Sequence, residues 1–227
     1  MKADPSDSDR LSRDRILVVL DVNIYLDVAR IVGAPFTWEK FDAAVRVALE
    51  SPIPNPTDAG YDSILAIATT RKGVHPSGAR LEVWTSEHID RLVALKAAQP
   101  PDARDPRDRG LGWPAHYARE LVEILINDVV VEYSNGDTIG VVAIPYGNPP
   151  LDHEDGCVFA TARDSGWSGI YYERYCITRD VQFRTAALPG QIDVLHPHEW
   201  VIRYRNESRA ASIATMPKPP RQKSPAG

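Results

Sequence analysis

Four carboxylates stand where the sequence predicts the end of a strand or the start of a helix. Asp21 and Asp180 each close a predicted strand, whereas Asp152 and Asp155 stand three residues apart before an alanine-rich segment. Carboxylate oxygens are hard ligands that suit Mg²⁺ or Mn²⁺, and such ions activate water for attack on a phosphodiester. The chemistry that these residue types favour is therefore metal-dependent hydrolysis.

Each of these acids also has a purely structural explanation. Asp152 and Asp155 fit the N-cap and the first-turn acid of a helix, and Asp21 and Asp180 fit turn positions. Carboxylates that gather in one place repel one another, and burial raises the cost of each charge unless cations neutralise it. The prediction of a metal site therefore depends on whether the fold brings the four acids together.

The elements that must position these acids alternate between strands and helices. Strands are predicted at 16–20, 81–85, 170–177 and 192–195, with further candidates at 129–133 and 139–144. Helices are predicted at 24–31, 38–49, 61–70, 87–98, from 114 and from 153. This alternation predicts an α/β fold with a mostly parallel central sheet of four or five strands, flanked by helices. Because parallel strands end at one edge, we expect the acids to be neighbours there.

Length and composition limit the class of protein. The 227 residues, 43% of them hydrophobic, allow one domain at 15–204, and we expect a disordered leader at 1–14 and a disordered tail at 205–227. No segment approaches the roughly 20 apolar residues of a membrane span, and the N-terminus has no signal-peptide pattern, so we expect a cytoplasmic protein without a membrane partner. A net charge of −5 argues against coating nucleic acid by charge alone.

Cysteine and histidine are weaker candidates for chemistry. Cys157 and Cys176 are expected to be buried free thiols, and no CxxC pair indicates a structural zinc. His153 lies beside the acids and is expected to be a solvated helix-start residue rather than a base. His196 and His198 are not expected to bind metal, because the proline between them ends the strand.

The ordered set of short motifs resembles the PIN-domain family of PilT N-terminus-type ribonucleases. Leu-Asp-Val-Asn at 20–23 looks like the motif that opens these domains, and Asp-His-Glu-Asp at 152–155 looks like their central acidic motif. Ile-Thr-Arg-Asp at 177–180 resembles their closing Thr-x-Asp, and Val-Leu-His-Pro-His-Glu-Trp at 194–200 resembles their last strand and helix start. The resemblance covers 15–204 in the family's order.

The resemblance implies a three-layer fold and a metal-dependent endoribonuclease. Asp21, Asp155 and Asp180 would hold one or two Mg²⁺ or Mn²⁺ ions, and Asn23 would orient Asp21 or a water. Asp152 or Glu154 would be an outer ligand or a helix cap. RNA would be the substrate, and an antitoxin protein and a second copy of the chain would be partners if the protein is a toxin.

One position departs from the family pattern. These domains usually carry a glutamate in the helix after the second strand, where this chain has Leu92. Asp90 or Glu87 could replace it, depending on the helical face that each occupies. Two alternatives therefore stay open: a fold with weakened or no catalysis that serves in binding or assembly, and a nuclease that acts on DNA.

Overall fold

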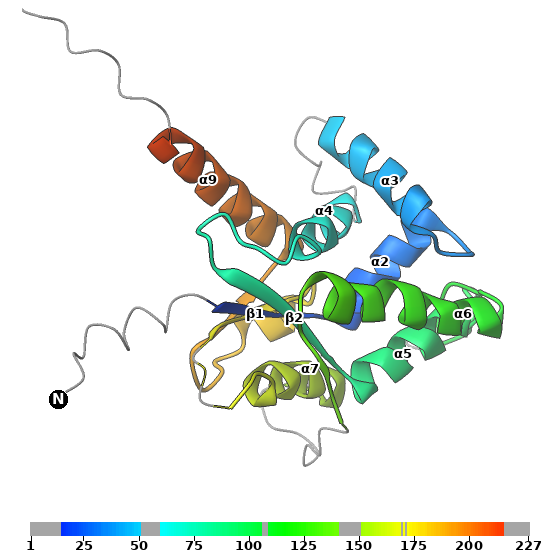
Figure 1. Cartoon of the computed structure of the whole chain (residues 1–227). Coiled ribbons are helices and arrows are strands. Elements are labelled where there is room, and N and C mark those ends of the chain that lie inside the picture. Colours follow the sequence, from blue (N-terminus) through cyan, green and yellow to red (C-terminus); the bar gives the residue numbers. More distant parts are fainter. Residues whose placement is uncertain are drawn as a thin grey trace, which may run out of the picture.

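The structure is a computed structural model that describes residues 15–50, 60–105, 109–140, 151–168, 170 and 172–215 (Figure 1). A five-stranded sheet has the order β3-β2-β1-β4-β5, and every neighbouring pair in it is parallel. The strands are β1 Arg15–Leu20, β2 Arg80–Ser86, β3 Thr138–Ile139, β4 Glu173–Ile177 and β5 Ile192–Leu195. The predicted α/β class with a parallel sheet flanked by helices is confirmed.

Strand β1 occupies the centre of the sheet. Its residues from Ile16 to Leu20 are all buried, as expected for a parallel strand that is covered on both faces. β1 pairs with β2 on one side and with β4 on the other, in a register that sets Leu20 beside Ile177. The backbone N–H of Asp21 donates to the carbonyl of Ile177 at 3.0 Å, so β1 and β4 end side by side.

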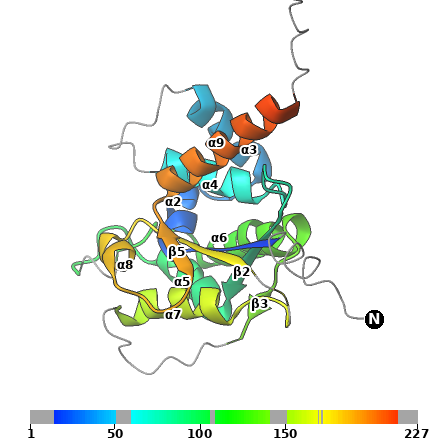
Figure 2. The same cartoon turned by 90° about the vertical axis from the view of Figure 1, so that its left-hand side faces the viewer.

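Helices cover both faces of this sheet (Figures 1 and 2). α3 Trp38–Glu50, α4 Tyr61–Thr70 and α9 Pro197–Thr215 lie above the sheet in both views, and α7 His153–Asp164 lies below it. α2 Val22–Val32 follows β1 directly, and α5 Glu87–Ala98 contacts both α2 and α7. α8 Val181–Thr185 joins β4 to β5, and α6 Ala115–Leu121 packs on α5. None of the described helices combines the length and apolar character of a membrane span.

The candidate strand at 129–133 is wrong. α6 continues there through the wider π-helical turns η2 Val122–Ile126 and η3 Asp128–Tyr133. Val129 and Val130 are both buried whereas Val131 is 52% exposed, which is the pattern of one helical face and not of an alternating strand. η3 packs against β2, so tertiary packing overrides the β-propensity of the three valines.

The predicted tail boundary at 204 is also wrong, because α9 continues to Thr215. Trp200, Val201 and Tyr204 are buried on its inner face, whereas 205–215 are exposed or half-buried, so the helix extends beyond its packed part. The expected disordered segments at 1–14 and 216–227, and most of the candidate strand at 139–144, lie outside the described residues.

Candidate metal centre

The carboxyl edge of the sheet brings together five of the acids that the sequence indicates. Asp21 caps α2, Asp180 caps α8 and Asp152 caps α7, each by accepting a backbone N–H of the first helical turn. Burial, and then the charges of Asp180 and Glu154, raise the pKa of Asp21. Burial, and then the charges of Asp21, Asp152, Asp180 and Glu154, raise the pKa of Asp155. These five carboxylates therefore share one electrostatic environment, which we call the carboxylate cluster.

Asp21 is the most deeply placed member of the cluster. Its carboxylate accepts from the backbone N–H of Val22 and from the Thr178 hydroxyl, both at 2.6 Å, and from the Asn23 side-chain amide. Burial raises the pKa of Asp21 to about 6, although the hydrogen bonds from Thr178 and Val22 oppose the shift. The carboxylate is therefore held in one orientation in a place that disfavours its charge.

Asp155 lies in the first turn of α7, where its backbone N–H donates to the Asp152 carboxylate at 3.0 Å. Burial raises the pKa of Asp155 to about 7, and the negative charges of the other cluster members add to the shift. Two carboxyl groups with raised pKa values at a sheet edge form a site whose charge a cation would neutralise.

The donor atoms of the cluster suit a hard cation. Asp21, Asp155 and Asp180 offer only oxygen, the ligand that Mg²⁺ and Mn²⁺ prefer. The three carboxylates do not all approach within 4.8 Å of one another, since His88, His153 and Cys157 form the one such group in the described part of the chain. An ion that retains several water ligands, as Mg²⁺ does, suits this wider spacing.

Asn23 and Thr178 connect the ends of β1 and β4 through side chains. The Asn23 amide donates to Asp21 and, at 3.1 Å, to the Thr178 hydroxyl, and its carbonyl accepts the Arg179 backbone N–H at 3.2 Å. The Thr178 hydroxyl also accepts the Asp180 backbone N–H at 2.9 Å. In the sequence, Thr178 stands in a motif without an evident side-chain role, and only its position two residues before Asp180 indicates one.

Thr178→Val is expected to lower the free energy of unfolding by about 1–3 kcal/mol, because it removes a donor from the buried Asp21 carboxylate. The substitution nearly preserves the shape of the side chain, so packing is little changed. Thr178→Ser keeps the hydroxyl and serves as the control, with an expected loss under about 1 kcal/mol. Urea denaturation measures both, and equal losses in the two variants would contradict a role for the hydroxyl.

A buried ion-pair network supports the loop that carries Asp180. The Arg179 guanidinium pairs with Asp27 of α2 and with Asp62 of α4, and both carboxylates are 6% exposed. The Ser63 hydroxyl donates to Asp27 at 3.0 Å, and His196 Nδ1 lies 3.6 Å from Asp62. The sequence does not indicate this network, because no local pattern links residues from four separate segments.

Helix α5 places its acids differently from the family pattern. Leu92 packs against the hydrophobic core, and Glu87 is exposed in the first turn. Asp90 accepts from the Thr85 hydroxyl at 2.8 Å and lies close enough to the buried Tyr25 of α2 to affect its pKa. Burial raises the pKa of Asp90 to about 6, so Asp90 is the inward-facing acid of this helix.

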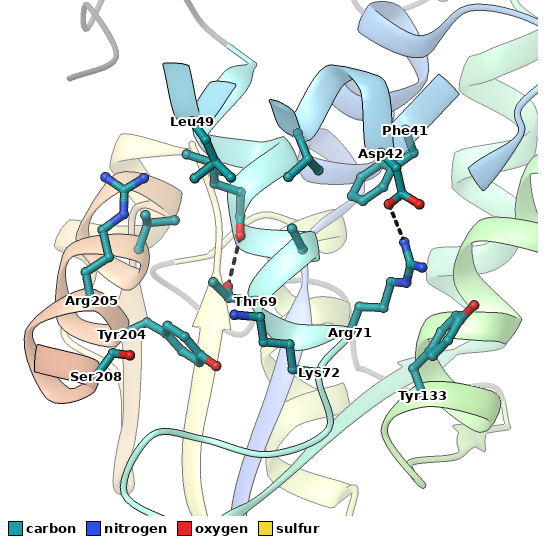
Figure 3. Close-up of a pocket in the computed structure, with 14 residues that line it drawn as sticks. Phe41, Asp42, Leu49, Thr69, Arg71, Lys72, Tyr133, Tyr204, Arg205 and Ser208 are labelled. Atoms are coloured by element: carbon teal, nitrogen blue, oxygen red, sulfur yellow. Dashed lines mark hydrogen bonds and ion pairs between the residues drawn. The ribbon is translucent and has the colours of Figure 1, made fainter. Parts of the chain in front are cut away.

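A separate pocket of about 570 Å³ lies between α3, α4 and α9 (Figure 3). Its lining is mainly apolar, with the cationic residues Arg71, Lys72 and Arg205 among the lining side chains. Arg71 donates to Asp42 at 2.8 Å and lies over the Trp38 ring, 4.3 Å from its centroid. None of the acids of the carboxylate cluster lines this pocket, so its apolar surface plays no part in the proposed metal chemistry.

No protein-family model, curated protein or solved structure matches the chain. The functional argument therefore depends on the residues and geometry described above.

Proposed function

We propose that this chain is a PIN-like, metal-dependent endoribonuclease that hydrolyses single-stranded or loop RNA with Mg²⁺ or Mn²⁺ as its cofactor. The supporting observation is that Asp21 and Asp180 follow the ends of the adjacent parallel strands β1 and β4, with Asp155 in the first turn of α7 near enough for their charges to act on it. Ligands of open α/β folds bind at this edge. The order of the motifs along the chain agrees with the same assignment.

In this proposal Asp21, Asp155 and Asp180 would hold one or two divalent ions. Such an ion supplies an activated water at neutral pH and neutralises charge on the phosphodiester. Asn23 and Thr178 keep the Asp21 carboxylate in a fixed orientation through their hydrogen bonds to it. Hydrolysis adds water across the bond between phosphorus and the 3′ oxygen, which leaves the 5′-phosphate and 3′-hydroxyl ends that the resemblance implies.

The test is cleavage of end-labelled single-stranded RNA by the purified chain with Mn²⁺ or Mg²⁺. Asp21→Asn and Asp180→Asn, separately and together, are expected to lower the cleavage rate at least about 100-fold, because each removes a cation ligand. Asp193→Asn is the matched control, since Asp193 is an exposed acid on β5. Unchanged cleavage in the site variants would refute the assigned site.

The alternative is a PIN-like fold with weakened or no catalysis that acts in binding or assembly. The observation that favours it is Leu92, which packs against the core at the position where the family usually carries an acid. RNA binding by the parent chain without cleavage in either ion would support this alternative. Cleavage of single-stranded DNA but not RNA in the same assay would identify a DNA-directed nuclease.

A further inference from the structure

Two imidazoles and one thiol form a second cluster beside the carboxylate cluster. His153 and Cys157 stand four residues apart on one face of α7, and the His153 Nε2 atom lies 4.0 Å from the Cys157 Sγ atom. His88 comes from the first turn of α5, which contacts α7. One ligating atom from each of the three residues lies within 4.8 Å of the other two.

The surroundings of the three side chains suit a metal ion. The Cys157 side chain is buried, and the rings of His88 and His153 meet edge to face with centroids 5.5 Å apart. The His88 Nε2 atom is buried without a hydrogen-bond partner among the described residues. A buried polar nitrogen that lacks a partner costs free energy, and coordination to a metal would remove this cost.

The charges around the cluster favour a cation. Burial, and then the charges of His153 and Arg91, lower the pKa of His88, which favours the neutral imidazole that binds metal. Burial and the charges of Glu154 and Asp152 raise the pKa of the Cys157 thiol, and the charge of Arg91 opposes them. The two acids place negative charge near the thiol, which favours a cation there, and a coordinated cation would deprotonate the thiol.

We propose that His88, His153 and Cys157 bind a borderline transition-metal ion, Zn²⁺ in the first instance, that links α5 to α7. Two imidazole nitrogens and one sulfur are ligands for Zn²⁺ and related ions and not for Mg²⁺. Ordinary Zn–S and Zn–N bond lengths in a tetrahedral site set the N to S distance at about 3.6 Å. The observed 4.0 Å between His153 Nε2 and Cys157 Sγ is close to this value, and the ligating atom of His88 lies within 4.8 Å of both.

This ion would differ from the Mg²⁺ or Mn²⁺ of the proposed function in its ligands and in its effect. His153 is exposed, so an ion can reach the three side chains from solvent. The ion would hold the first turn of α5, which carries Asp90, against the first turn of α7, which carries Asp155. It would thereby fix the relative position of two helices that border the carboxylate cluster.

The test is titration of the reduced, metal-free chain with Co²⁺ and then Zn²⁺, followed by absorbance spectroscopy. The parent is expected to bind one Co²⁺ per chain with a thiolate-to-cobalt charge-transfer band, and Zn²⁺ is expected to displace it. Removing a side chain that only hydrogen-bonds to a metal ligand costs about 10–100-fold in metal affinity. Cys157→Ser and His88→Gln remove ligands themselves, so they are expected to weaken Zn²⁺ binding at least about 100-fold. Cys157→Ser should also lose the charge-transfer band.

Two controls make the result specific. Cys176→Ala removes the other free cysteine, and His116→Gln removes an exposed histidine on α6, and both variants should keep the band and the affinity. Asp155→Asn should also keep them, so this site and the proposed nuclease site can fail independently. Circular dichroism checks that each variant is folded.

Three outcomes would overturn the proposal. The first is a parent chain that binds neither ion, and the second is a band that persists in Cys157→Ser. The third is loss of binding in Asp155→Asn with binding retained in His88→Gln, which would assign the ion to the carboxylate cluster.

Discussion

Asp155→Asn is expected to lower cation-dependent RNA cleavage by about 1,000-fold and to stabilise the metal-free protein at pH 7.5. The loss of activity follows from the removal of a cation ligand. A bound cation lowers the activation free energy by several kcal/mol, and losing this effect corresponds to about 1,000-fold in rate. The gain in stability follows from the removal of a negative charge that burial and four neighbouring acids disfavour. Opposite effects on activity and stability are typical of functional sites.

The stability gain should depend on pH in a defined direction. In the fold the pKa of Asp155 is raised from 3.8 to about 7, so the unfolded chain releases this proton at lower pH than the folded chain does. Ionisation of Asp155 therefore lowers the free energy of unfolding progressively between about pH 4 and pH 7. We expect Asp155→Asn to gain about 1–2 kcal/mol over the parent at pH 7.5, after allowance for solvent screening, and nothing near pH 4.

Urea denaturation of both proteins at pH 4.5 and 7.5, in the presence of a chelator, measures this difference. The comparison with the parent at each pH cancels the titration of the histidines, which are the same in both proteins. Asp164→Asn is the matched control, because Asp164 is an exposed acid at the end of the same helix and pairs with Arg163. A gain of the same size at both pH values would contradict the proposed origin of the effect.

Arg179→Met is expected to lower the free energy of unfolding by about 3–5 kcal/mol, which is the second large effect. The substitution keeps much of the side chain's length but removes the cation that pairs with Asp27 and Asp62. Both carboxylates are buried, and the partners that they would keep are weaker: the Arg30 side chain that pairs with Asp27 is 60% exposed, and His196 lies 3.6 Å from Asp62. Asp180 follows Arg179 directly, so we expect RNA cleavage to fall as well.

The triple variant Arg179→Met, Asp27→Asn, Asp62→Asn distinguishes loss of pairing from loss of packing. It removes both buried charges together with their partner and should recover most of the lost stability. Arg163→Met is the surface control, because the pair between Arg163 and Asp164 is about half exposed and its loss should cost under about 1 kcal/mol. A triple variant as unstable as Arg179→Met alone would show that the guanidinium acts through packing.

Local patterns in the sequence were enough to predict the fold class and the positions of the acids along the chain. The apolar run before Asp21 fitted a strand covered on both faces, and residues 16–20 are buried at the centre of the sheet. The spacing of Asp152 and Asp155 fitted a helix start, and Asp152 caps α7. These predictions succeeded because strand burial and helix capping depend on neighbours within a few residues.

Local patterns failed where distant contacts decide the structure. The valines at 129–131 favour a strand by propensity, yet packing against β2 holds them in a π-helical turn. The spacing of the cysteines does not indicate the proposed site of His88, His153 and Cys157, because His88 comes from a different helix than the other two residues.

The α/β fold, with carboxylates at strand ends and helix starts, can be inferred from the order of residues along the chain. Which of these carboxylates interact depends on contacts between distant segments. Thr178 donates to Asp21 across 157 residues of chain because β4 pairs directly with β1, and Arg179 reaches Asp27 and Asp62 from the same strand end. The physical reason is that strand order and helix packing are set by burial over the whole chain and not by any local pattern.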